Sequence, residues 1–302
     1  MTFKFSIVTP AYNSEKYIRE TIESVIKQKG DFCIEYFVLD NNSTDHTCHI
    51  VREYQKLLTA GKFKIFCSDV KLHLISQHDK GMYDAIKMGF ERAHGELFAW
   101  INSDDIYLPG AFDIIQRTFE RYPKIMWLKG ITSYMNKNST ICSTGHCNLY
   151  RQDWIKAGLY GTVLYFIQQD SVFWRADLWH NSGGVDNELG YAGDFFLWKS
   201  FAEISPLYSL NAYVSCFRKT PNQKSTNIQE YFKEIFTKMT LDKKLSIKIK
   251  LYFNHLDSLP RILRPLFYRL LFGRHQHYLL TLSNFTDPCL SEGDYYDLKD
   301  KI

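Results

Sequence analysis

The sequence lacks both of the glycine-rich loops that usually bind nucleotide phosphates, GxGxxG and GxxxxGK[ST]. Their absence argues against a dinucleotide-binding protein and against a phosphate-loop enzyme. If the chain binds a phosphorylated nucleotide, it holds the phosphates in another way, and a metal ion is the natural candidate. CxxC pairs are missing as well, and the seven cysteines are scattered along the chain. This pattern predicts reduced thiols in a cytoplasmic protein and no structural zinc site.

Long apolar runs are also absent. No stretch approaches the roughly 18 uncharged apolar residues that a membrane-spanning helix needs. Residues 1–13 lack the charged leader, apolar run and cleavage site of a secretory signal, so we expect a cytoplasmic protein. The net charge of +4 is uneven, because residues 1–232 are neutral and residues 233–280 carry +7. The chain as a whole gives no reason to expect a nucleic-acid partner.

Strand and helix signals alternate over the first hundred residues. The predicted strands cover residues 5–9, 36–39, 63–66 and 97–101. One helix is predicted from an N-cap at Ser14 to Ile26 and another from Met82 to Ala93. Between them lies a helix with apolar positions Ile50, Val51, Tyr54 and Leu57. This alternation is typical of a parallel α/β sheet flanked by helices.

Three polar clusters follow strands of this sheet, at residues 9–13, 40–45 and 102–105. Ligands of parallel α/β sheets bind at the carboxyl ends of the strands, so the clusters predict a site at one edge. Asn102 and Asp104 point to the same side of an extended chain, and a carboxylate there can hold one hard divalent cation. The alternative is a turn that caps the next helix, since Asp is common in turns.

Five stretches carry a more specific signal. They read SIVTPAYNSEKYIRETIESV, EYFVLDNNSTDHT, DKGMYDAIKMGFERAHGELFAWINSDDIYLPGAF, QQDSVFWR and GGVDNELGYAGDFFLW, in this order. Together they resemble the family 2 glycosyltransferases of the GT-A fold, over about the first 225 residues. The resemblance implies a GT-A domain at 1–225. Residues 226–302 would then be a helical, basic and aromatic C-terminal extension.

The resemblance also implies a donor site with a metal. Its donor-binding residues would be Thr9, Ala11, Tyr12, Asn13, Asp40, Gly81, Asp84, Asn102 and Ser103. Asn102 and Asp104 match the first and third positions of the family's Asp-x-Asp motif, so Asp104 would coordinate Mn²⁺ or Mg²⁺. Asn102 brings no charge where the family has Asp, which predicts weaker metal binding. Asp105 would support the surroundings of the metal.

The family resemblance places the catalytic base at Asp194, in the segment YAGDFFLW. Direct displacement at a sugar carbon needs a carboxylate that takes the proton of the acceptor. An alternative role for Asp194 is to cap the helix that follows. Relatives often have a second Asp two residues later, where this chain has Phe196. Asp186 and Glu188 are weaker candidates that would contact the acceptor instead.

Further residues are assigned to the acceptor and to the diphosphate. The acceptor side would include Gln169, Trp174 and Arg175, because Trp stacks on sugar rings and Arg binds phosphate. The alternative places Trp174 in the core. Arg218, Lys219 and Lys224 lie in a polar loop. The resemblance implies that this loop closes over the diphosphate, where cations would stabilise its charge. A solvated basic loop is the alternative.

The predicted reaction is a metal-dependent, inverting transfer of a hexose from a nucleotide sugar, UDP-linked by first choice, to an acceptor hydroxyl in polysaccharide or glycolipid synthesis. The alternatives are a nucleotidylyltransferase, which would be expected to have a glycine-rich phosphate loop, and a nucleotide-sugar-binding protein without turnover. Residues 241–280 interleave cations with apolar residues. This pattern is typical of a helix that lies on an anionic membrane surface, here the inner face of the membrane. We expect a saccharide or lipid-linked acceptor. Helices that pack on the catalytic domain are the other interpretation.

Overall fold

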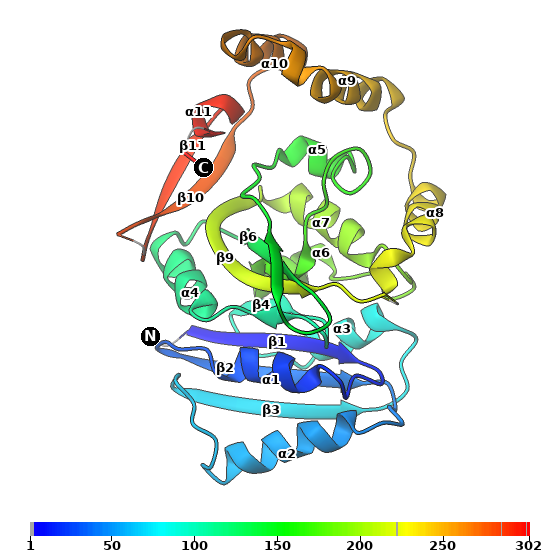
Figure 1. Cartoon of the computed structure of the whole chain (residues 1–302), viewed down its shortest axis with the longest axis vertical. Helices are drawn as coiled ribbons and strands as arrows, with labels where there is room; N and C mark the ends of the chain where they lie inside the picture. Colours follow the sequence, from blue (N-terminus) through cyan, green and yellow to red (C-terminus); the bar gives the residue numbers. More distant parts are fainter. Residues whose placement is uncertain (1–2, 222, 285, 300) are drawn as a thin grey trace.

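The computed structural model describes residues 3–221, 223–284, 286–299 and 301–302. In these residues eleven strands form one mixed sheet, with the order β11-β10-β9-β6-β8-β4-β1-β2-β3, while β5 pairs with β9 and β7 with β6 (Figure 1). The strands are β1 (Phe3–Ala11), β2 (Phe32–Asp40), β3 (Asp69–Ser76), β4 (Leu97–Trp100), β5 (Ile106–Tyr107), β6 (Trp127–Met135), β7 (Ile141–Thr144), β8 (Val172–Arg175), β9 (Tyr208–Arg218), β10 (His277–Ser283) and β11 (Asp287–Gly293). The predicted α/β class is confirmed.

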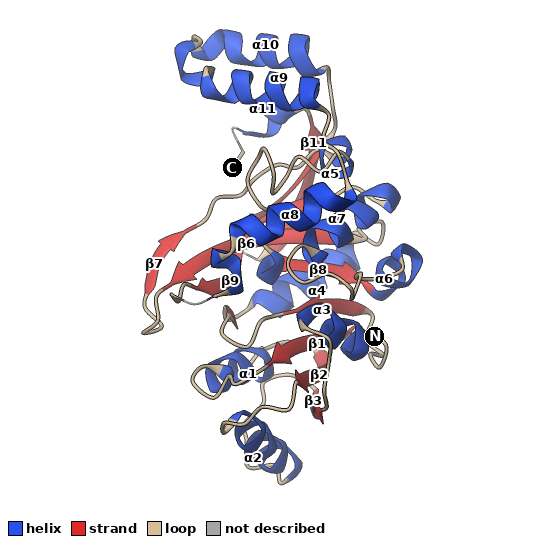
Figure 2. Cartoon of the chain, turned by 90° about the vertical axis from the view of Figure 1, so that its right-hand side faces the viewer, coloured by secondary structure: helices blue, strands red, loops and turns tan. Residues whose placement is uncertain are grey.

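Helices flank this sheet (Figures 1 and 2). Those before residue 205 are α1 (Ile18–Ile26), α2 (Thr47–Thr59), α3 (Met82–Phe90), α4 (Ala111–Arg121), α5 (Gln152–Lys156), α6 (Ala176–Ser182) and α7 (Gly193–Ile204). Later come α8 (Ile228–Lys238), α9 (Lys243–Asn254), α10 (Arg264–Phe272) and α11 (Tyr295–Lys299). Among the described residues, no helix is both long enough and apolar enough to cross a membrane.

The N-terminal half of the sheet is parallel, as the sequence predicted. β1 pairs with β2 and β4, and β2 pairs with β3, all in parallel. The strand predicted at 63–66 is wrong, because β3 begins at Asp69 and residues 63–66 contribute only an isolated bridge to Lys29. The side chains of Phe63 and Ile65 pack against the core from a loop. β3 is an edge strand whose polar residues hid it from a search for apolar runs.

The centre of the sheet reverses direction at β8. This strand pairs antiparallel with β4 and with β6, and β6 is in turn parallel to β9. The register places Trp174 of β8 opposite Phe98 of β4 and Trp127 of β6. Trp100 and Trp198 of α7 stack 5.6 Å apart beside them. The high aromatic content therefore supplies much of the core, with rings packed edge to face or stacked.

The C-terminal residues contain more than the helices expected there. The helices are confirmed as α8, α9 and α10, and α9 and α10 lie side by side at one end of the molecule (Figures 1 and 2). The chain then returns to the sheet, where β10 pairs in parallel with β9 and antiparallel with β11. No strand was predicted here, because the pairing partners come from distant parts of the sequence.

Candidate active site

The three polar clusters meet at the carboxyl edge of the parallel strands, as predicted. Ala11 and Asp40 are register partners at the ends of β1 and β2. The amide of Ile101 donates to the Val8 carbonyl oxygen at 3.0 Å and extends β4 beside β1. The first two clusters bond directly, because the Thr44 amide donates to Asn13 Oδ1 at 2.9 Å. Ser14, which follows the first cluster, has its hydroxyl oxygen 2.7 Å from that of Ser103 in the third. Ser14 is therefore a site residue rather than the predicted N-cap, and α1 begins only at Ile18.

Asp40 offers an unused acceptor at this edge. Its Oδ2 accepts hydrogen bonds from the Ser43 amide, the Ser76 hydroxyl and the Cys48 thiol. Burial alone would raise the pKa of Asp40, but these bonds outweigh burial and hold the pKa below its usual value. Its Oδ1 is buried and has no hydrogen-bond partner among the described residues. A buried, ionised oxygen without a partner indicates a ligand that donates a hydrogen bond.

Some of the residues at 9–13 are buried and support the end of β1, and others lie at the surface. Thr9 is fully buried and its Oγ1 lies 2.9 Å from the Tyr36 hydroxyl oxygen. The prediction that Thr9 lines the nucleotide base is therefore wrong for its side chain, which supports the end of β1 from inside the protein. Tyr12 is 61% exposed, next to the buried Ala11. Asn13 accepts a bond from the Thr44 amide at 2.9 Å and so fixes one loop against the next.

The 102–105 turn contains a second buried acceptor. Asn102 Oδ1 is buried and has no partner among the described residues, while its Nδ2 makes only long contacts of 3.4 Å to Asp105 and Gln169. Asp104 Oδ2 accepts a bond from Gln223 Nε2 at 2.9 Å, and burial raises the pKa of Asp104. Asp105 is fully buried and accepts from the Arg218 amide at 2.7 Å, so it supports the turn and does not face a ligand.

The oxygen atoms of this turn fit a hard divalent cation that takes most of its ligands from the substrate and from water. No group of three or more His, Cys, Asp or Glu within the described residues could hold a metal ion. Mg²⁺ and Mn²⁺ are often held by one or two carboxylates, with substrate phosphates and water completing the shell. Asp104 matches that pattern as a single carboxylate, and Asn102 lies two residues before it in the same turn.

The start of α3 borders the site on another side. Gly81 precedes the helix with a φ of +138°, a conformation that other residues rarely adopt. Asp84 Oδ1 accepts from the Asn187 side chain at 2.7 Å and Oδ2 from the Lys80 amide at 3.1 Å, so the pKa of Asp84 is lowered, mainly by the bond from Asn187. Asp84 therefore ties α3 to the loop before α7.

Asp194 is the second residue of α7 and does not cap it, because Ala192 occupies the N-cap position. The Phe195 amide donates to its Oδ1 at 2.8 Å. The Tyr83 hydroxyl donates to the Tyr191 carbonyl oxygen, and its oxygen also lies 3.3 Å from Asp194 Oδ1. Burial raises the pKa of Asp194 to about 6. A carboxylate with this pKa is ionised at neutral pH and still basic enough to take a proton.

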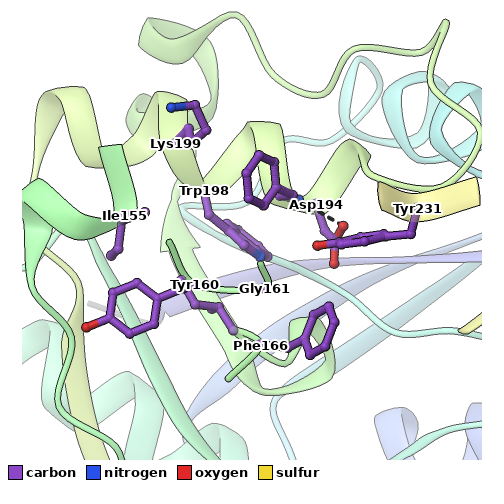
Figure 3. A pocket seen from close by; sticks show the side chains of 10 residues that line it. Ile155, Tyr160, Gly161, Phe166, Asp194, Trp198, Lys199 and Tyr231 are labelled. Carbon is purple, nitrogen blue, oxygen red and sulfur yellow. Dashed lines mark hydrogen bonds between the residues drawn. The ribbon is translucent and has the colours of Figure 1, made fainter. Parts of the chain in front are cut away.

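The cavity at Asp194 has aromatic walls (Figure 3). The ring of Tyr231, from α8, lies beside the carboxylate (Figure 3). The Phe166 ring packs against Tyr231 with centroids 5.5 Å apart. Asp186 and Glu188, the weaker candidates for the base, form ion pairs with Lys238 and Lys80 instead. Asp194 is the carboxylate that the structure leaves facing this cavity.

Two of the three residues assigned to the acceptor side are misplaced, because β8 runs antiparallel to β4. Gln169 lies at the site, where its Nε2 donates to the Trp100 carbonyl oxygen at 2.6 Å. Trp174 is fully buried in the core, so the prediction that it stacks on a sugar is wrong. Arg175 is opposite Leu97, at the start of β4, and donates to carbonyl oxygens of Phe119 and Ile125. That end of β4 is opposite the ligand edge, so its assignment is also wrong.

The three basic residues assigned to one loop have different surroundings. Arg218 is fully buried at the end of β9, where its Nε donates to the Asp104 carbonyl oxygen at 2.7 Å and its NH2 to Glu20 at 2.9 Å. It holds the turn and cannot close over a diphosphate. Lys219 lies over the Tyr134 ring. Lys224 lies over the rings of Tyr83 and Tyr191, next to the Asp194 site.

Sequence reasoning missed several residues of this site. They are Tyr83, Gln223, Tyr231 and Glu234. Tyr83 stood inside a recognised stretch, DKGMYDA, but nothing in its spacing separated it from a core residue. The other three lie beyond the stretches that carried the resemblance. Only tertiary contacts could reveal them.

Comparison with known proteins adds to this geometry. Residues 6–140 match the family model described as Glycosyl transferase family 2. An uncharacterized glycosyltransferase of Haemophilus influenzae is 22% identical over 98% of this chain and 94% of that protein. The poly(ribitol-phosphate) beta-N-acetylglucosaminyltransferase TarS of Staphylococcus aureus is 34% identical over 34% of this chain, which corresponds to 16% of TarS.

Solved structures share the fold. Residues 1–349 of TarS in complex with UDP-GlcNAc have a TM-score of 0.57 and 19% identity, covering 86% of this chain and 74% of that chain. A mannosyltransferase of Pyrobaculum calidifontis in complex with GDP-Man and Mn²⁺ has a TM-score of 0.53 and 14% identity, covering 90% of this chain and 76% of that chain. The GT-A fold expected from the sequence is confirmed.

Proposed function

The chain belongs to glycosyltransferase family 2, and we propose that it transfers a hexose from a UDP-sugar to an acceptor hydroxyl with inversion at the sugar carbon. One arrangement carries the proposal. Gln223 donates to Asp104, and the next residue, Lys224, lies over the ring of Tyr83, whose hydroxyl is 3.3 Å from Asp194. Two consecutive residues thus link the candidate cation ligand to the candidate base, which supports a shared site.

The donor would bind along the carboxyl edge of the sheet. Asp40 Oδ1 and Asn102 Oδ1, both buried and without partners among the described residues, would accept hydrogen bonds from the base and the ribose. Tyr12 would stack on the base from its exposed position. UDP is the first choice because TarS binds UDP-GlcNAc, and GDP is the alternative that the mannosyltransferase complex suggests.

Mn²⁺ or Mg²⁺ would be held by Asp104, with Asn102 beside it. When bound, the cation would neutralise charge on the departing diphosphate. Asp194 would remove the proton of the acceptor hydroxyl while the acceptor oxygen bonds to the sugar carbon. The bond from that carbon to the diphosphate oxygen breaks with its electron pair on the diphosphate. Attack from the side opposite the diphosphate inverts the configuration at the carbon.

Of the two alternatives, family membership and the missing glycine-rich loop disfavour a nucleotidylyltransferase. A nucleotide-sugar-binding protein without turnover remains the second candidate. The uncharged Asn102 in the first position of the metal motif favours it, because one carboxylate fewer weakens cation binding.

The direct test is nucleotide release from a panel of UDP-, GDP- and dTDP-sugars with Mn²⁺, with and without saccharide acceptors. We expect release from one UDP-sugar, because a bound water can replace the acceptor slowly. Chelation of the metal should abolish it. Release from a GDP-sugar instead would correct the donor. Binding of a donor without release, even with acceptors, would favour the binding protein, and no binding at all would contradict the proposal.

The paired helices α9 and α10 would attach the enzyme to an anionic membrane surface. Their inner faces pack together, with Tyr252 and Tyr268 centroids 5.7 Å apart. The outer face of α10 and the turn before it expose an apolar stripe at helical spacing: Leu263, Leu266, Phe267 and Leu270. Lys243, Lys244 and Lys250 of α9 are exposed as well. Apolar groups that enter the lipid boundary beside cations suit anionic lipids.

Vesicle flotation tests this surface. We expect the protein to float with phosphatidylglycerol-containing vesicles and not with phosphatidylcholine vesicles, and binding should weaken at high salt. The double variant L266E/L270E should lose flotation, since two charges would have to enter the lipid boundary. The matched control I141E changes an exposed apolar residue of β7 and should bind normally. Equal flotation of L266E/L270E and wild type would contradict the assignment.

A further inference from the structure

The most unusual hydrogen-bonding group outside the donor site is the carboxylate of Glu234, on α8. It accepts bonds from three consecutive backbone amides: Gly190 to Oε1 at 2.6 Å, Tyr191 to Oε2 at 2.8 Å and Ala192 to Oε2 at 2.8 Å. These amides lead directly into the N-terminus of α7. A carboxylate satisfies donors of this kind better than a neutral group, since hydrogen bonds to an ionised acceptor are the stronger ones.

Two glycines in the same segment show that other residues pack closely against it on both sides. A Cβ at Gly190 would lie 2.9 Å from Glu234 Oε1, so a side chain there would push the carboxylate away. A Cβ at Gly193 would lie 2.7 Å from the ring of Tyr83. The segment is thus clamped between α8 on one side and α3 on the other. Asp194 is the first residue after these contacts.

We propose that Glu234 is a positioning residue for Asp194, and that α8 therefore belongs to the active site. The inference rests on the proposed role of Asp194 as the base. By holding the amides of 190–192, Glu234 fixes the residue that caps α7 and hence the direction of the carboxylate two positions later. Tyr231, one turn earlier on α8, provides a wall of the same cavity. A small displacement of a catalytic group is enough to reduce a rate strongly.

The test compares E234Q with the matched control E230Q, which changes an exposed carboxylate of the same helix that pairs with Lys233. Gln offers one acceptor oxygen in place of two and no charge, so at least one amide loses its partner. We expect kcat of E234Q to fall about tenfold or more with the KM for the donor unchanged. The pH below which activity falls should move lower, because a loosened segment exposes Asp194 to water and so reduces the effect of burial on its pKa. E230Q should match wild type.

Hydrogen exchange gives a readout that does not need turnover. The amides of 190–192 should exchange faster in E234Q than in wild type and E230Q, because they lose their acceptor. Unchanged exchange, or a folded E234Q with the kcat and pH profile of wild type, would overturn the positioning role alone. A fully active D194N variant would instead show that Asp194 is not the base, and the proposed function and this inference would both need revision.

Discussion

D194N should lose about 100-fold to 10,000-fold in kcat, which is the range that a positioned general base contributes. The amide keeps an oxygen for the Phe195 amide and for Tyr83, so the fold around it should persist. It cannot take the proton of the acceptor hydroxyl. Steady-state transfer to an identified acceptor is the measurement. The control E203Q changes an exposed carboxylate of the same helix that pairs with Lys156, and should remain active.

The same residue sets the expected pH dependence. Burial raises the pKa of Asp194 to about 6, and only the ionised form can accept a proton. Activity should therefore be full above that pH and fall tenfold per pH unit below it. Lys224 acts in the opposite direction to burial, since its charge lowers the pKa. K224M should move the fall in activity to higher pH, and an unchanged profile in both D194N and K224M would rule out Asp194 as the titrating group.

D104A should reduce donor cleavage by at least about 100-fold and abolish its response to Mn²⁺, because it removes the carboxylate proposed to hold the cation. Asp104 also bonds to Gln223, so loss of that contact is a second possible cause of inactivity. D104N separates the two causes, because its amide oxygen can still accept from Gln223 while the charge is gone. We expect D104N to be as inactive as D104A.

Thermal stabilisation provides an independent measure of the metal site. UDP with Mn²⁺ should raise the melting temperature of wild type more than UDP alone, since a ligand that binds only the folded state stabilises it. In D104N the two conditions should give the same shift. A D104N protein that keeps Mn²⁺-dependent activity and stabilisation would show that the cation is held elsewhere.

Local sequence patterns were sufficient for the parallel half of the sheet and for the position of the site. The runs that became β1, β2 and β4 are apolar because they are buried on both faces, and burial of this kind is visible in sequence. The polar clusters after them had to meet, because parallel strands share one carboxyl edge. The position of Asp40 at the end of β2 follows from these local rules, whereas the roles assigned to Asp40, Asp104 and Gly81 come from the family resemblance and remain proposals.

The errors and omissions arose where contacts join distant segments. Trp174 and Arg175 were assigned to the acceptor because their residue types suit sugars and phosphates. The antiparallel pairing of β8 with β4 buried the first and turned the second to the opposite edge. Likewise, Arg218 carries a charge that suits a diphosphate, yet a pairing with Glu20, 198 residues away, holds it inside the protein.

The sequence by itself determined the fold class and the edge of the sheet where the candidate site lies, and it supplied the carboxylates that we propose for a cation and for a base. Tertiary structure alone decided how the proposed base, Asp194, is held. Glu234 lies 40 residues after Asp194, in a helix outside the matched family segment, and no local pattern predicts that its carboxylate would gather three backbone amides. Side chains acquire such roles through packing, because hydrogen bonds between distant segments depend on where the chain brings them and not on their spacing.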